Sequence, residues 1–161
     1  MLEAVNISAR QSTLIQEIIK ETMLAIDLKP GQKISETFNL QVNLKKSVED
    51  FIDQNNFLQQ KKSSIHQHAP VNNNRINELL GKAQPSFNRI VTIGYRVANS
   101  DTASLQKNGS YYIRSLLASE KTFRTAMEEV SRQYVFLLEE DMKQAATINT
   151  GKFITLLVIF I

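Results

Sequence analysis

The sequence LLASEKTFRTAMEEVSRQY, residues 116–134, decides the fold class of this chain. Apolar residues recur there at spacings of three and four, which is the period of an α-helix packed in a bundle or a coiled coil. The register extends over about five heptads and comprises Leu116, Phe123, Met127, Val130, Tyr134, Leu137 and Ile148. Polar Glu120, Asp141 and Gln144 occupy three further positions of it. Because no proline or glycine interrupts residues 110–150, we expect one helix roughly 60 Å long.

Residues 153–161, which follow this helix, are almost all apolar. A membrane-spanning helix needs about twenty such residues, so we interpret the segment as the first half of a span that the sequence truncates. The alternative is an apolar terminal segment that folds against its own domain. We therefore expect one domain over residues 1–152 and the start of a transmembrane helix over residues 153–161.

Length, composition and charge agree with one helical domain. A chain of 161 residues has room for one core, and five glycines with three prolines favour helices over a turn-rich β-fold. The absence of cysteine excludes disulfides, thiolate metal sites and cysteine nucleophiles. A net charge of +3 with dispersed basic residues argues against nucleic-acid binding. The first residues do not form a signal peptide, so in an extracytoplasmic protein a targeting segment and a first span would precede Met1.

The first expected helix, residues 6–27, carries two adjacent stripes. One stripe contains Ile7, Gln11, Leu14, Ile18 and Ala25, and the other contains Val5, Ser8, Ser12, Ile15, Ile19, Thr22 and Ile26. So broad an arc fits a helix that faces its own bundle on one side and a second subunit on the other. It fits equally well a single wide core face. In the first case the dimer seam includes Val5, Ser12, Ile15 and Ile19, and the small polar side chains of Ser8 and Ser12 leave a pocket there.

Two more helices are expected between the first and the last. Pro30-Gly31 predicts a turn over residues 28–33, and a helix over residues 36–58 follows, with Leu40, Leu44, Val48, Phe51, Ile52 and Leu58 directed inward. Residues 59–71 are polar and predict a loop, and the three asparagines at 72–74 offer an N-cap for a third helix. The core register of that helix is Ile76, Leu80, Ala83, Phe87, Ile90, Gly94 and Val97.

Two residues of the third helix have special geometry. We expect Pro85 to kink the helix and Gly94 to allow a neighbouring helix to approach closely. Residues 99–108 predict a polar connection to the last helix. Together the four helices predict an all-α, antiparallel up-down-up-down four-helix bundle. Both chain ends then lie at the same end of the bundle, where a pair of membrane spans would attach.

No pattern of catalytic residues is present. The chain lacks a glycine-rich phosphate loop, a paired histidine–carboxylate helix motif and a nucleophile elbow. His66 and His68 are too few ligands for a metal site, and the acidic run at residues 139–141 is typical of a solvated helix face. We therefore expect a protein that is not an enzyme, with no metal site and no cofactor.

Residues 6–18, NISARQSTLIQEI, resemble the opening motif of the PilJ-type domain. That domain occurs in type IV pili methyl-accepting chemotaxis transducers and, in related form, in nitrate/nitrite sensor kinases. The matching residues are Asn6, Arg10, Gln11, Leu14 and Gln16, while Ala9 stands where the family usually has glycine. Segments 79–87 and 119–134 are also similar to the family, so the resemblance covers most of the chain.

The resemblance implies a sensor domain and makes four residues candidate ligand contacts: Ser8, Arg10, Gln11 and Ser12. Ser12 stands where the nitrate sensors have the arginine that binds the anion, and Glu17 stands where the family often has a basic residue. The departures mean that the resemblance does not extend to nitrate recognition.

From these observations we expect an extracytoplasmic, periplasmic sensor domain of a receptor in the bacterial inner membrane. A small ligand or a partner protein would shift the first helix of a homodimer against the fourth, and the fourth would carry that shift across the membrane. The output module would be a histidine kinase, a chemotaxis signalling domain or a cyclase. The alternative is a helical-bundle protein–protein interaction module that senses nothing, which predicts an apolar surface patch and no ligand pocket.

Overall fold

The computed structural model describes residues 2–27, 34–64 and 70–159, and in these ranges it contains four helices and no strand. The helices are α1 (Leu2–Ile26), α2 (Ile34–Ser64), α3 (Pro70–Ala98) and α4 (Thr102–Ile159). The predicted all-α class and the predicted number of helices are therefore confirmed over the described residues.

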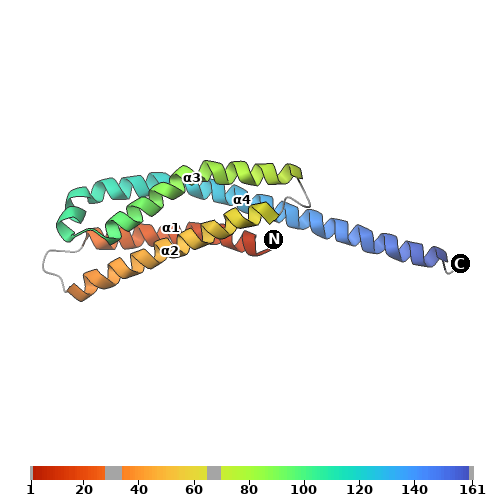
Figure 1. Ribbon diagram of the computed structural model, residues 1–161, viewed down its shortest axis with the longest axis horizontal. Helices are drawn as coiled ribbons and strands as arrows, with labels where there is room; N and C mark the ends of the chain where they lie inside the picture. Colours follow the sequence, from red (N-terminus) through yellow and green to blue (C-terminus); the bar gives the residue numbers. More distant parts are fainter. Residues whose placement is uncertain (1, 28–33, 65–69, 160–161) are drawn as a thin grey trace.

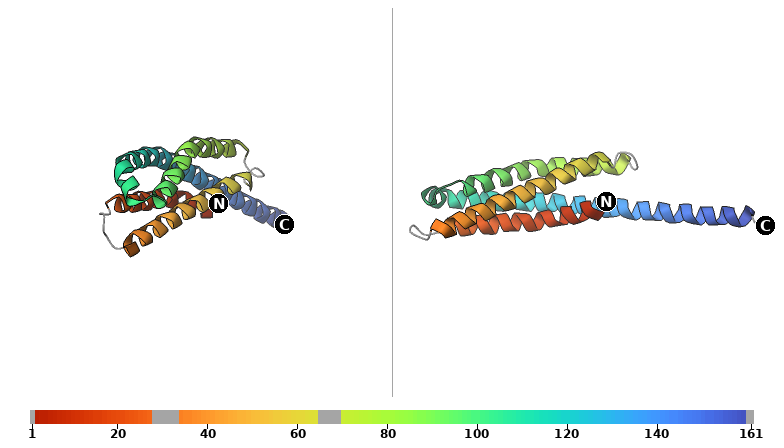
Figure 2. Two further views of the ribbon diagram at one scale, coloured as in Figure 1. Left: turned by 60° about the vertical axis from the view of Figure 1, so that its left-hand side comes forward. Right: turned by 60° about the horizontal axis from the view of Figure 1, so that its bottom comes forward.

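The helices lie side by side along the long axis of the molecule, and consecutive helices run in opposite directions (Figure 1). Helices α1 and α3 each pack mainly on α2 and α4. We call the part where all four helices lie together the packed region. Helix α4 leaves this region and continues well past the ends of the other three helices, as the views in Figure 2 agree.

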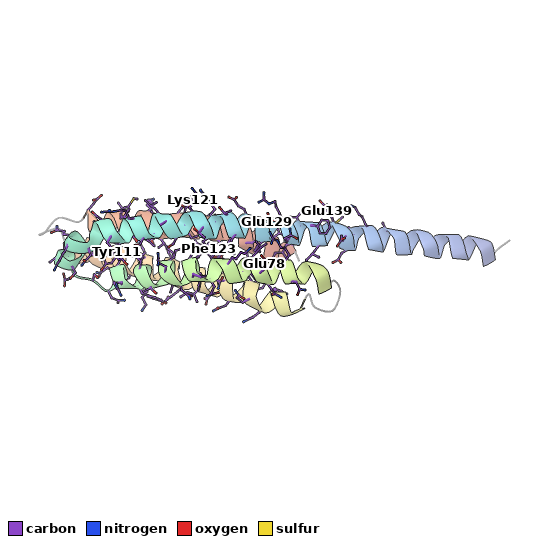
Figure 3. The ribbon with its side chains drawn as sticks, turned by 90° about the horizontal axis from the view of Figure 1, so that it is seen from above. Glu78, Tyr111, Lys121, Phe123, Glu129 and Glu139 are labelled. Atoms are coloured by element: carbon purple, nitrogen blue, oxygen red, sulfur yellow. The ribbon has the colours of Figure 1, made fainter. Side chains whose placement is uncertain are left out.

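The packed region holds one apolar core to which every helix contributes. Its centre is an aromatic cluster in which the Phe51 ring of α2 lies 5.0 Å from that of Phe87 in α3 and 5.2 Å from that of Phe123 in α4, measured between centroids. Offset and tilted ring pairs at such distances add to the free energy of apolar burial. In Figure 3 Phe123 points between the helices, whereas Lys121 on the same helix points outward.

Most of the predicted inward residues are buried. In α4 these are Leu116, Phe123, Met127, Val130, Tyr134 and Leu137; in α3 they are Ile76, Leu80, Ala83, Phe87, Ile90, Gly94 and Val97; in α2 they are Leu44, Val48, Phe51 and Leu58. Leu40 and Ile52 are half-buried. The side chains of Gln144 and Ile148 lie outside the described residues.

The loop predicted over residues 59–71 is wrong at both ends. Helix α2 continues to Ser64, because no proline or glycine stands between Ile34 and that residue. Helix α3 begins at Pro70, since proline is well suited to the first position of a helix, where no backbone donor is needed. The asparagines at 72–74 therefore lie inside α3 and do not cap it. The turn predicted at 28–33, and the two histidines, fall outside the described residues.

The connection predicted over residues 99–108 is also too long. Helix α4 begins at Thr102, because the Asp101 carboxylate accepts a hydrogen bond from the Ser104 backbone N–H at 2.7 Å and so caps the first turn. The helix has 58 residues, which corresponds to about 87 Å. Within the described residues, the structure offers no helical stretch that combines the length and the apolar character of a membrane span.

Two glycines bring helices close together. A Cβ on Gly94 of α3 would lie 2.5 Å from Val48 Cγ2 of α2, so the predicted close approach at Gly94 is confirmed. A Cβ on Gly109 of α4 would lie 2.6 Å from Ile26 Cγ2, at the end of α1. Pro85 lies inside α3 without ending it, and Figure 1 shows α3 bent along its length, as a proline in a helix interior predicts.

Candidate functional site

Both stripes of α1 are covered by the chain's own helices. Leu14 and Ile18 of the first stripe are buried, and in the second stripe Ile15 is 0% and Ile19 is 8% exposed. Ile15 and Ile19, two of the four residues predicted for a dimer seam, therefore belong to the core of the single chain. Val5 and Ser12, the other two, are half-buried.

The four candidate ligand residues do not gather at one place. Gln11 is fully buried, and its Nε2 donates to the Phe51 carbonyl oxygen of α2 at 3.4 Å, while its Oε1 accepts no hydrogen bond. Arg10 is exposed. Ser8 and Ser12 line a common hollow. The structure thus divides the motif into one core residue, one surface residue and two residues at a groove.

That groove, which we call the polar hollow, lies between α1 and α4. It has a volume of about 460 Å³ and is lined by Ser8, Ala9, Ser12, Glu128, Ser131 and Arg132. Small side chains on α1 leave the space, since residues 8, 9 and 12 recur at helical spacing on the face beside α4. Ser8 is buried, and its hydroxyl donates to the Val5 carbonyl oxygen at 2.9 Å.

Of the charged side chains that line the polar hollow, Arg132 has an ion-pair partner and Glu128 has none among the described residues. Arg132 Nε lies 3.0 Å and its Nη2 lies 2.9 Å from Glu129 Oε2, and Gln133 Nε2 donates to Glu129 Oε1 at 3.1 Å. The hydrogen bond from Gln133, with the charge of Arg132, holds the pKa of Glu129 below its usual value. Glu128 is exposed and forms no ion pair within the described residues. The guanidinium of Arg132 is thus paired with Glu129, whereas the carboxylate of Glu128 is available to a ligand.

A second hollow of about 470 Å³ lies farther along the same two helices, and we call it the apolar hollow. Its lining is Gln16, Ile19, Lys20, Met23 and Leu24 of α1 with Leu117 and Glu120 of α4. Met23, Leu24 and Leu117 are 36%, 45% and 44% exposed, which is high for large apolar side chains. Glu120 Oε1 pairs with Arg124 Nη1 at 3.2 Å on the same helix.

Three residues of the polar hollow, Glu128, Ser131 and Arg132, were not among those selected from the sequence. They are spaced three and four apart on α4, on the side next to its buried stripe. The sequence shows that spacing, but it does not show which helix covers that side. In the described ranges, no three histidine, aspartate or glutamate side chains come together as a metal site would require.

No protein-family model, curated protein or solved structure matches this chain. A function for it must therefore follow from the residues and geometry just described.

Proposed function

We propose that this chain is the ligand-sensing domain of a membrane-bound receptor, with its four helices acting as an antiparallel up-down-up-down bundle. The observation that carries the proposal is α4 itself, which is one continuous helix of 58 residues. It is part of the core at Phe123 and Tyr134 and then extends past the other helices (Figure 1). The resemblance of residues 6–18 to the PilJ-type motif supports the same conclusion.

A helix with this course suits signal transfer along its axis. Displacement of α1 against α4 by an ångström or two would reach the far end of α4 without an intervening loop. In this proposal residues 153–161 enter the bacterial inner membrane, the packed region lies on the periplasmic side, and a histidine kinase, chemotaxis or cyclase module receives the shift.

Membrane entry is tested by floating the full chain with vesicles of phosphatidylethanolamine and phosphatidylglycerol. We expect the chain to float with the vesicles and the double variant Leu156→Glu/Leu157→Glu to remain in the dense fraction, because charged side chains are costly in hydrocarbon. The matched control is Thr122→Glu/Thr125→Glu, which adds the same charge at exposed positions of α4. Flotation of both variants alike would contradict the membrane role.

The receptor is proposed to be a homodimer, and the exposed side chains of the apolar hollow are the surface we assign to the second copy. Since Ile15 and Ile19 are internal, lysine at either position would unfold the chain before it tested a seam. Leu117 offers a cleaner test, because the chain has no cysteine and Leu117→Cys introduces a single thiol. We expect this variant to form a disulfide-linked dimer in vesicles faster than Val42→Cys, an equally exposed position on α2. Equal rates would contradict this seam.

The second candidate is a helical-bundle interaction module that senses nothing. The exposed Met23, Leu24 and Leu117 favour it, because such a module needs an apolar docking surface. The two functions differ in their response to small molecules. A sensor domain changes the distance between α1 and α4 when its ligand binds, whereas a docking module does not.

A further inference from the structure

We propose that the polar hollow binds the ammonium group of a small primary amine, with Glu128 as its counter-charge and the hydroxyl oxygens of Ser12 and Ser131 as further acceptors. This inference rests on the proposed sensor function and deepens it, because it names the class of ligand. It also moves the binding site away from Arg10 and Gln11, which the sequence motif suggested.

The donors and acceptors of the hollow match an ammonium group. A primary ammonium has three N–H donors and no acceptor. The hollow offers one carboxylate, on Glu128, and hydroxyl oxygens on Ser12 and Ser131. The Ser8 hydroxyl already donates its one hydrogen bond to the Val5 carbonyl oxygen, so the Ser8 oxygen is left to act as an acceptor as well. Hydrogen bonds from a charged donor to such oxygens are shorter and stronger than neutral ones.

The charges at the hollow favour a cation over an anion. An anion would need a free cation, but the guanidinium of Arg132 is held by Glu129 through two of its nitrogens. Glu128, Glu129 and Arg132 together carry one net negative charge. A cation is therefore attracted to the hollow and an anion such as nitrate is repelled, although solvent screening keeps both effects modest at this exposed place.

The position of the hollow links binding to the proposed signal. Ser8 and Ser12 belong to α1, whereas Glu128 and Ser131 belong to α4. A ligand held by both sets favours the relative placement of the two helices that satisfies all its donors. This difference in affinity between two helix placements is what a ligand needs in order to shift a conformational equilibrium.

The experiment is a calorimetric titration of the full chain in mild nonionic detergent with methylammonium and ethanolamine. Tetramethylammonium serves as the matched probe, because it has the same charge but no N–H donor. We expect the primary amines to bind and tetramethylammonium to bind about tenfold more weakly or not at all. Equal binding of methylammonium and tetramethylammonium would overturn the hydrogen-bonded site, and binding of nitrate or acetate in their place would overturn the charge argument.

Variants locate the binding on the chain. Glu128→Gln should weaken primary-amine binding at least about tenfold and Ser131→Ala several-fold, whereas Glu139→Gln, at an exposed position of the same helix, should have no effect. Circular dichroism shows whether each variant remains helical. Unchanged binding by a folded Glu128→Gln variant, or no binding of any amine to the native chain, would overturn the proposal.

The amine titration and the vesicle flotation test the two proposals separately. Amine binding through Glu128 in a chain that does not enter vesicles would support the site and contradict the receptor. A chain that enters vesicles and dimerises but binds no amine would keep the receptor and reject this class of ligand.

Discussion

Replacing Gln11 by leucine is expected to stabilise the chain. Gln11 is fully buried beside the aromatic cluster, and its Oε1 is an acceptor without a donor. An unsatisfied buried polar group costs about 1–3 kcal/mol, whereas the hydrogen bond that would be lost, from Nε2 to the Phe51 carbonyl at 3.4 Å, is long and contributes about 0.5 kcal/mol. Leucine occupies a similar volume, so little is lost in packing.

The net change is an increase of about 1–2 kcal/mol in the free energy of unfolding. For a chain of this size that corresponds to a rise of about 2–8 °C in Tm. Urea unfolding followed by circular dichroism measures this change in the free energy of unfolding. The control is Gln106→Leu, at an exposed position of α4, which should change the free energy of unfolding by less than about 0.5 kcal/mol. A loss of 1 kcal/mol or more in Gln11→Leu would refute the reasoning, because it would mean that the amide has satisfactory partners in the folded chain.

Three further changes test other parts of the core. Tyr134→Phe should leave the free energy of unfolding unchanged or raise it by up to about 1 kcal/mol in urea unfolding. The reason is that the buried hydroxyl has no partner, and burial raises the pKa of Tyr134 to about 12. A clear loss of stability would show that the hydroxyl forms a hydrogen bond in the folded chain. Gly94→Ala should lower the free energy of unfolding by about 1–2 kcal/mol in the same urea experiment, since the overlap with Val48 outweighs the gain in helix propensity. Adding Val48→Ala should recover part of that loss, and an unchanged free energy of unfolding in Gly94→Ala would contradict the close packing. Burial raises the pKa of Glu21 above its usual value of 4.5, so its contribution to stability is complete below that value and is lost as pH rises through the raised pKa. Glu21→Gln should therefore raise Tm at neutral pH and make the profile of Tm against pH flatter above about pH 4.5, and an unaltered profile would contradict the burial argument.

The helices could be predicted where burial of one helix face places apolar residues at spacings of three and four in the sequence. The core positions of α3 and α4 follow one heptad register, and few breakers compete with it, so their inward residues could be assigned before the structure. The ends of helices were less predictable. Residues 59–64 are polar without being helix breakers, and their helical state depends on continuation from α2. The start of α4 had a local signal in Asp101 and Ser104, which the polar composition of residues 99–108 obscured.

The candidate site was predictable only in part, for a different reason. Periodicity shows how wide the buried arc of α1 is, but it does not show which helix covers each side. Ile15 and Ile19 fit a seam with a second copy as well as they fit a core, and the placement of the other helices decides between the two. The same placement puts Glu128 and Ser131 opposite Ser12, which no spacing within α1 could indicate.

We expect the contact between Gly109 and Ile26 to act as a pivot at one end of the α1–α4 pair. A branched side chain seated directly against a backbone without a Cβ leaves little room for sliding, so relative motion of the two helices should be an angular one that grows with distance from this point. Arg132 lies 23 residues farther along α4, or about 35 Å. A tilt of about 2° then moves the helices apart by about 1 Å at the polar hollow, and by more at the far end of α4. Enlarging the pivot with Gly109→Ala would change the angle at which α1 leaves it, and a spin-label distance measured near Arg132 would register that change more strongly than one measured near Leu117.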